Sequence, residues 1–184
     1  GTGAELAVTG VGFQPDLTWL KIRSTTGHHQ AFDAARGVTK VIYPSQTDPE
    51  GTIAQSLKTF DSDGFTLGTG GYVNSNTNTY VAWNWKAGTT SGLTGGTITP
   101  TAYSFNTTAC FSAIAYTGNY TSGATVPHGL GVKPNMILVK NLSTAVDWAV
   151  YHSALGATKY MNINTDSGAG TASTRWNDTE PDAS

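Results

Sequence analysis

Two stretches of the sequence align without a gap when the chain is shifted by 119 residues. Residues 10–21 align with residues 129–140, and the same register continues to residues 40 and 159. A repeat constrains the fold more than any local pattern, because each copy must form the same supersecondary unit. We therefore predict two tandem copies of one unit. The identical pairs are Gly10/Gly129, Gly12/Gly131, Pro15/Pro134, Lys21/Lys140, Ser24/Ser143, Thr25/Thr144, Ala35/Ala154, Gly37/Gly156, Thr39/Thr158 and Lys40/Lys159.

The two copies are out of phase with the chain. The counterpart of the candidate strand 111–116 would precede Gly1, and the counterpart of the candidate strand 80–85 would follow Ser184. We predict a first repeat over residues 1–100 that lacks its opening strand, and a second over residues 101–184 that lacks its closing strands. This phase favours a segment of a longer repeat-containing polypeptide.

Composition and periodicity indicate an all-β protein. The chain has 22 glycines, is rich in threonine, and carries 5 Trp, 8 Tyr and 6 Phe; branched and aromatic side chains suit pleated strands, and glycine suits tight turns. Only residues 52–60 could form a helix. Short strands separated by frequent turns predict an antiparallel sandwich or jelly roll. The expected strands are 17–22, 80–85, 111–116, 136–140, 149–152 and 160–163, with 17–22 and 136–140 buried on both faces.

The charge balance limits the partners. Charged residues make up 12% of the chain and the net charge is -2, whereas soluble domains average about 25% charged residues. Such a chain cannot build the basic face that gives proteins affinity for nucleic acid. No apolar run approaches the roughly 20 residues of a membrane-spanning helix, so we expect no membrane insertion. Cys110 is the only cysteine; it can form no disulfide within the chain, and we expect it to be a small buried residue.

The chain contains several long motifs, which are Phe13-x-Pro-Asp16, Asp33-x-x-Arg-Gly-x-Thr-Lys40, Phe60-x-Ser-Asp-Gly-Phe-Thr-Leu-Gly68, Asn78-Thr-Tyr-Val-Ala-Trp83, Trp85-Lys-Ala-Gly88, Tyr116-Thr-Gly-Asn119, His128-Gly-Leu-Gly131 and Trp148-x-Val-Tyr-His-x-x-Leu-Gly-Ala-Thr-Lys159. Together these motifs resemble a repeated β-rich domain of marine bacteriophage proteins. Those proteins look like virion components of the tail-fibre or appendage type with lectin-like sandwich architecture. The resemblance covers nearly the whole chain.

The resemblance implies a non-enzymatic structural protein of a phage virion, on the surface of the extracellular particle and without a cofactor. We expect it to form a homo-oligomer, with a trimer favoured as in phage fibres, to bind other virion proteins, and to contact host surface glycans. An incomplete sandwich exposes unpaired strand edges, which gives this self-association a physical motive. One alternative is a carbohydrate-binding, lectin-like module of a secreted or surface protein. Another is a glycan depolymerase.

A depolymerase would need two convergent carboxylates, and Asp61 and Asp63 are the closest such pair. Because Gly64 follows them, a turn explains the pair better; a calcium-assisted loop is the second reading, although the later ligands of an EF-hand are missing. We expect His28 and His29 to lie in a loop or at a strand edge. Asp33 and Arg36 are expected to form a charged pair that anchors a turn.

Tryptophan rings are the remaining candidates for ligand contact, because a flat ring can cover the face of a sugar. Trp19, Trp83 and Trp85 lie in apolar strand patterns, where rings usually fill cores. Trp148 and Trp176 have less apolar neighbours. Trp148 and Trp176 are therefore the better candidates for exposed rings that contact a glycan or a protein partner.

Overall fold

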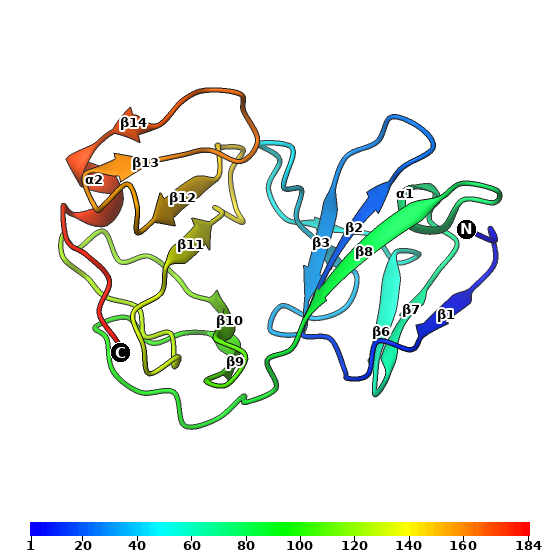
Figure 1. Ribbon diagram of the computed structural model, residues 1–184, viewed down its shortest axis with the longest axis horizontal. Coiled ribbons are helices and arrows are strands. Elements are labelled where there is room, and N and C mark those ends of the chain that lie inside the picture. The colour runs from blue at the N-terminus through cyan, green and yellow to red at the C-terminus, as the bar shows by residue number, and fades with distance from the viewer.

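The computed structural model describes residues 1–184 and is mostly β, with short antiparallel strands and two one-turn helices (Figure 1). Neither helix is long or apolar enough to cross a bilayer. The N-terminal half contains β1 (Leu6–Thr9), β2 (Leu17–Ile22), β3 (Gln30–Asp33), β4 (Lys40–Val41), β5 (Gly51–Thr52), β6 (Leu57–Asp61), β7 (Gly64–Leu67), α1 (Gly71–Asn74) and β8 (Tyr80–Trp85). The C-terminal half contains β9 (Ala102–Asn106), β10 (Phe111–Ala115), β11 (Met136–Val139), β12 (Ala149–His152), β13 (Lys159–Tyr160), β14 (Gly170–Thr171) and α2 (Ser173–Trp176).

The N-terminal half is built on two three-stranded antiparallel sheets. Their strand orders are β1-β7-β6 and β3-β2-β8, and β4 and β5 form a separate two-stranded pair. Side chains from both three-stranded sheets meet in one core, which also includes Val41 and Val73. The main contributors are Leu20, Phe32, Leu57, Phe65 and Leu67, each at most 3% exposed.

β2 is the central strand of its sheet, and the burial of its residues alternates along the strand. Thr18, Leu20 and Ile22 are buried, while the residues between them are only partly covered. Successive side chains of a strand point to opposite faces, so one face of β2 meets this core, while Leu17 and Trp19 on the other face pack against a smaller cluster of Ala31, Ile42 and Trp148. Residues 17–22 are therefore fully buried on one face only. β8 pairs with all six residues of β2, from Leu17↔Trp85 to Ile22↔Tyr80.

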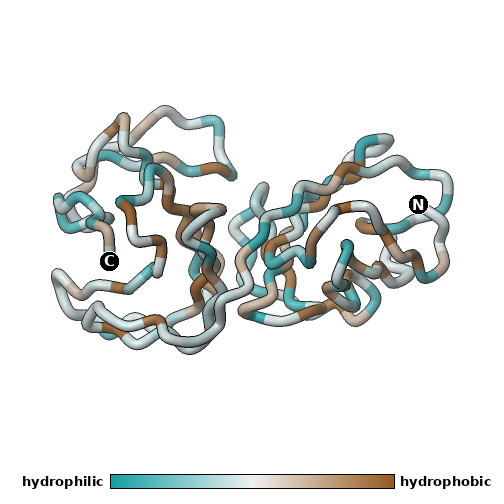
Figure 2. The backbone as a smooth tube through the Cα atoms, turned by 60° about the horizontal axis from the view of Figure 1, so that its bottom comes forward, coloured by the Kyte–Doolittle hydropathy of each residue, from teal (hydrophilic) through white to brown (hydrophobic).

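The C-terminal half consists of three two-stranded sheets, β9-β10, β11-β12 and β13-β14. Figure 2 shows hydrophobic segments in both halves. The structure thus bears out a mostly β, antiparallel fold with little helix, and it shows small sheets in place of a closed sandwich.

Strand pairing in the two halves follows the same registers at an offset of 119 residues. Leu17↔Asp33 corresponds to Met136↔His152, and Lys40↔Thr52 corresponds to Lys159↔Thr171. The isolated bridge Ala31↔Ile42 likewise corresponds to Val150↔Met161. Even a connection outside the ladders recurs: the Ala34 N–H donates to Asp16 O, and the Ser153 N–H donates to Asn135 O.

Several local expectations need correction. Residues 52–60 form no helix; they end β5 and begin β6, because Leu57 is drawn into the core and pairs with Leu67. Of the strand expected at 160–163, only Tyr160 lies in a strand, β13, and Met161 forms an isolated bridge with Val150. β11 is not buried on both faces, since Met136 and Leu138 are exposed. Cys110 is exposed, with a φ of 51°, in the turn between β9 and β10.

The two halves contact each other through both polar and aromatic groups. The Ser104 hydroxyl donates to Asp16 Oδ1 at 2.8 Å, and the Glu50 N–H donates to Leu142 O at 3.0 Å. Lys140 Nζ donates to Thr47 O at 2.9 Å. The Trp85 and Phe111 rings stack with centroids 6.2 Å apart. The predicted boundary at residue 100 lies between β8 and β9, and these contacts join residues on its two sides.

Candidate functional site

A row of aromatic side chains lies on the face of the β3-β2-β8 sheet opposite the seven-residue core and extends to β10. We call Trp19, Trp83, Trp85 and Phe111 the aromatic row. Trp19 of β2 is paired with Trp83 of β8, so both rings point to the same face. These rings meet edge-on at 6.3 Å, and the Trp85–Phe111 stack continues the row onto β10.

The aromatic row is open to solvent at its β8 end. Trp83 is 45% exposed and Trp85 is 36% exposed, while Trp19 is half-buried. The expectation that all three rings fill a core is therefore wrong for Trp83 and Trp85, because Leu20 and Ala82 on the opposite face provide the contacts with the core. Exposed flat rings of this kind can cover an apolar surface, such as the face of a sugar.

His29 holds the half-buried end of the row. Trp19 Nε1–H donates to His29 Nδ1 at 2.8 Å, and the two rings pack edge-on. The acceptor nitrogen must carry no proton, so this contact requires a neutral imidazole. Partial burial lowers the pKa of His29, and the nearby charges of Lys21 and His28 lower it further. His28 and His29 lie in the loop between β2 and β3, as predicted.

Trp148 is buried, at 5% exposure, and the expectation that it is exposed is wrong. Its ring packs against Ala31 and Ile42 of the N-terminal half. Its Nε1–H donates to Tyr43 O at 2.9 Å, and its own N–H donates to Asn164 Oδ1. The polar neighbours in the sequence gave the wrong signal because the partners of the ring lie about a hundred residues earlier in the chain. Trp148 therefore has no free ring face for a sugar and joins the two halves.

Trp176 is half-buried at the end of α2. Its ring meets Tyr151 edge-on at 5.9 Å, and its Nε1–H donates to Lys159 O at 3.0 Å. In the 119-residue register, Trp176 corresponds to Leu57, a core residue of the N-terminal half. Burial raises the pKa of Tyr151 to about 12, and its hydrogen bond to Glu180 adds to the shift. Trp176 thus covers Tyr151 with part of its ring.

Asp61 ends β6 and Asp63 lies in the tight turn between β6 and β7, as predicted for a turn. Two backbone N–H groups, Gly10 at 3.0 Å and Gly12 at 2.6 Å, donate to the Asp63 carboxylate. These bonds, with the Gly12 bond the stronger influence, lower the pKa of Asp63. Asp61 accepts a hydrogen bond from the Thr66 hydroxyl at 2.7 Å. No group of three or more His, Cys, Asp or Glu side chains in the chain is placed to hold a metal ion.

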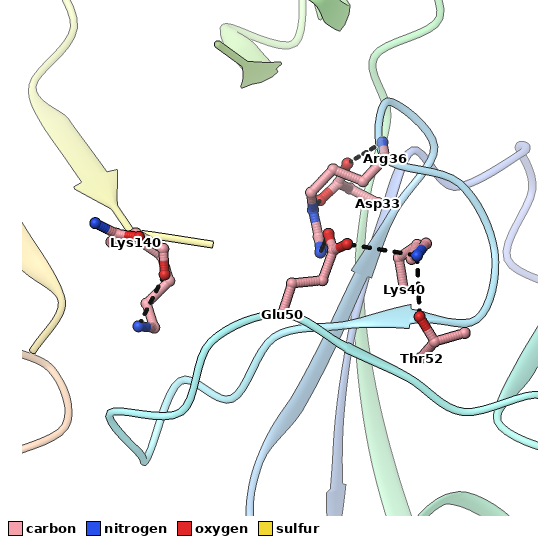
Figure 3. A network of polar contacts seen from close by, with 7 residues as sticks. Asp33, Arg36, Lys40, Glu50, Thr52 and Lys140 are labelled. Carbon is pink, nitrogen blue, oxygen red and sulfur yellow. Dashed lines mark hydrogen bonds and ion pairs between the residues drawn. The ribbon is translucent and has the colours of Figure 1, made fainter. Parts of the chain in front are cut away.

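A compact ionic network lies beside β3 and β4 (Figure 3). Arg36 contacts Asp33 Oδ2 at 2.6 Å and Glu50 Oε2 at 3.0 Å, and the Arg36 N–H donates to Asp33 Oδ1. Lys40 adds a contact with the other Glu50 oxygen at 3.7 Å. The expected turn-anchoring pair of Asp33 and Arg36 is confirmed. Arg36 Nη2 is buried without a hydrogen-bond partner. The counterparts of Asp33, Arg36 and Glu50 are His152, Leu155 and Ala169, so the network is not repeated.

One family model, described as Domain of unknown function (DUF7483), matches residues 1–184. The chain belongs to this family. No curated protein and no solved structure matches the chain.

Two features of this DUF7483 domain were not anticipated from the sequence. The aromatic row depends on which face of β8 meets the core, and alternation places Trp83 and Trp85 together without saying which side is covered. Asp16 is 4% exposed and accepts hydrogen bonds from the Ala87 N–H and the Ser104 hydroxyl. Its position in the Phe13-x-Pro-Asp16 motif was the available signal, but its partners are far away in the sequence.

Proposed function

We propose that this DUF7483 domain is a non-enzymatic structural unit of a bacteriophage virion appendage of the tail-fibre or spike type. The observation that carries the proposal is the buried contact of Trp148 with Ala31, Ile42 and Tyr43. It fixes two successive β units against each other, which is what an extended appendage built from tandem units requires. The motif resemblance described above supports the link to phage virions and, with it, the proposed location on the particle surface.

The appendage proposal includes a duplicated unit. Equal pairing registers of β2-β3 with β11-β12, and of β4-β5 with β13-β14, support two copies at an offset of 119 residues. The lone bridges at Ile42 and Met161 support the same offset. Units of a tandem array bury surface against their neighbours, as Trp148 does here.

We further propose that the domain associates with copies of itself, as a trimer in the assembled appendage, and with other virion proteins. The exposed apolar side chains of β11 and β8 support an interface, because free monomers rarely expose such groups side by side. Sedimentation of the native polypeptide measures this directly. A species of one chain at all concentrations contradicts the self-association.

The test of the virion role uses phage particles that carry a DUF7483 domain. Mass spectrometry of purified particles should detect the polypeptide, and gold-labelled antibodies raised against residues 1–184 should mark a tail fibre or spike in electron micrographs. The same antibodies pre-absorbed with the purified chain serve as the control. Particles that lack the polypeptide, or label confined to the head shell, contradict the appendage role.

A second candidate function is carbohydrate binding, and the exposure of Trp83 and Trp85 in the aromatic row favours it. A glycan array probed with the purified chain should then show selective binding that Trp83→Ala abolishes. Tyr120→Ala is the matched control, since Tyr120 is a fully exposed aromatic residue in the loop that follows β10. Silence across the array, or equal loss in both variants, contradicts a glycan site at the aromatic row.

A further inference from the structure

β2, the central strand of the β3-β2-β8 sheet, and its C-terminal counterpart β11 differ in their number of neighbouring strands. β2 has a neighbour on each edge, β3 on one side and β8 on the other. β11 occupies the position of β2 in the 119-residue register, yet it pairs only with β12. The edge of β11 that corresponds to the β8 side of β2 has no strand beside it (Figure 1).

Backbone geometry shows which groups lie on this free edge. The Ser153 N–H donates to Asn135 O, so the Met136↔His152 pair is one in which the two residues do not bond each other. In an antiparallel ladder, hydrogen-bonded and non-bonded pairs alternate. The N–H and C=O groups of Met136 and Leu138 therefore point away from β12, while those of Ile137 and Val139 point toward it.

The matching groups of β2 are bonded to β8. The Arg23 N–H donates to Thr79 O. Alternation from that pair places Leu17 opposite Trp85, and Trp19 opposite Trp83, in the hydrogen-bonded positions. Met136 and Leu138 are the counterparts of Leu17 and Trp19. The free edge of β11 thus presents the same donors and acceptors that β2 uses to hold β8.

The side chains of β11 are also more exposed than those of β2. Met136 is 49% exposed and Leu138 is 39% exposed, whereas Leu17 and Trp19 are half-buried. On the other face, Ile137 and Val139 are half-buried, whereas their counterparts on β2 are at most 2% exposed. Each residue of β11 is therefore less covered than its counterpart on β2.

We propose that the free edge of β11 is a binding site for one antiparallel strand with the chemistry of β8. The incoming strand carries large aromatic side chains opposite Met136 and Leu138, and small or polar side chains at the alternate positions. The β2-β8 pair fixes the register: Trp85 of a β8 sequence lies opposite Met136, and Trp83 lies opposite Leu138. Main-chain hydrogen bonds supply the attachment and the alternating side chains supply the selectivity, as in other cases of strand addition.

The test adds a synthetic peptide with the sequence of residues 78–88 to the intact chain. Hydrogen exchange followed by NMR should show slowed exchange of the Met136 and Leu138 amides, while the Ile137 and Val139 amides, already bonded to β12, change little. Exchange slowed only at another strand edge, or no saturable change at millimolar peptide, overturns the proposal.

N-methylated peptides provide matched controls. In the proposed register, the Trp83 N–H of the peptide bonds to β11, whereas the Ala82 N–H points away from it. Methylation at Trp83 should weaken binding at least tenfold, and methylation at Ala82 should leave most of it. Equal loss from both peptides indicates non-specific contact of the aromatic rings and contradicts the strand site.

A variant of the chain tests the same edge from the other side. Leu138→Lys should abolish peptide binding, and Val38→Lys, at an exposed position of the N-terminal half, should not. Far-ultraviolet circular dichroism and the unfolding midpoint report whether each variant folds. Binding retained by a folded Leu138→Lys chain also overturns the proposal. These results do not depend on where a particle carries the domain, so they are separate from the test of the appendage role.

Discussion

At the scale of single residues, a few polar side chains join segments that are far apart in the sequence. Asn74 is fully buried; its amide nitrogen donates to Gly68 O at 2.9 Å and to Ala4 O, and its amide oxygen accepts from the Thr2 N–H. Asp16, which directly precedes β2, likewise binds the segment after β8 through Ala87 and binds β9 through Ser104. Buried polar groups of this kind stabilise a fold only while every partner is present, because an orphaned donor keeps its desolvation cost.

Replacement of Asp16 by alanine should be strongly destabilising. It leaves the Ala87 N–H and the Ser104 hydroxyl without an acceptor, and each buried unpaired group costs about 1–3 kcal/mol. Chemical denaturation should show this loss in the free energy of unfolding. Asn135→Ala is the matched control, because Asn135 is the exposed counterpart of Asp16, and it should change stability by less than about 0.5 kcal/mol. Equal effects of the two substitutions contradict the role given to Asp16.

The contact between Trp19 and His29 should depend on pH. The pKa of His29 is lowered in the folded protein, so the neutral ring favours folding at pH values above the unfolded pKa of about 6.5. This contribution falls as the pH drops from there to the folded pKa. An NMR titration should show the Trp19 Nε1–H resonance moving with the His29 ring signals, below pH 6.5. In His29→Gln, whose amide oxygen accepts at every pH, the shift of the Trp19 resonance should disappear; its persistence assigns the change to another group.

At the scale of elements, the sequence predicted strands well where alternation and turn residues agreed. Residues 17–22, 80–85 and 149–152 form strands with the predicted bounds. Periodicity could not say which face of a strand is covered, so the exposure of Trp83 and Leu138 was missed. Residues 52–60 favoured a helix locally, but pairing with β7 and burial of Leu57 outweighed that preference. Trp148 was misjudged because its partners lie about a hundred residues earlier in the chain.

The sheet β1-β7-β6 should be sensitive to a methyl group at Gly64. A Cβ there would lie 1.9 Å from Val8 O, and the φ of 154° disfavours other residues. Gly64→Ala must push β1 away from β7, and we expect a loss of more than about 1 kcal/mol in the free energy of unfolding. Gly71→Ala at the start of α1 meets no atom within 4 Å and should be neutral or slightly stabilising. A stable Gly64→Ala chain would show that β1 does not need its close approach to β7.

At the scale of the whole molecule, the two halves differ in how completely they bury their apolar residues. The N-terminal half has a core of seven buried apolar side chains, whereas the second cluster combines Ala31 and Ile42 with Trp148 from the other half. The C-terminal half therefore gains part of its burial from its neighbour. Stability of the C-terminal half should depend on this contact more than stability of the N-terminal half does.

Removal of the Trp148 ring should uncouple the halves. Trp148→Ala deletes a buried ring, a change that typically costs about 3–5 kcal/mol, and it also removes the hydrogen bond to Tyr43 O. Calorimetry should show a single transition for the unmodified chain, and two for Trp148→Ala, with the earlier one assigned to the C-terminal half by the loss of amide protection at Val150 and Tyr151. Trp148→Phe keeps most of the packing and should lower the midpoint without splitting the transition. Since Trp176 lies within the C-terminal half, Trp176→Ala should lower the stability of that half without affecting the coupling. A single, unshifted transition in Trp148→Ala contradicts the coupling through this ring.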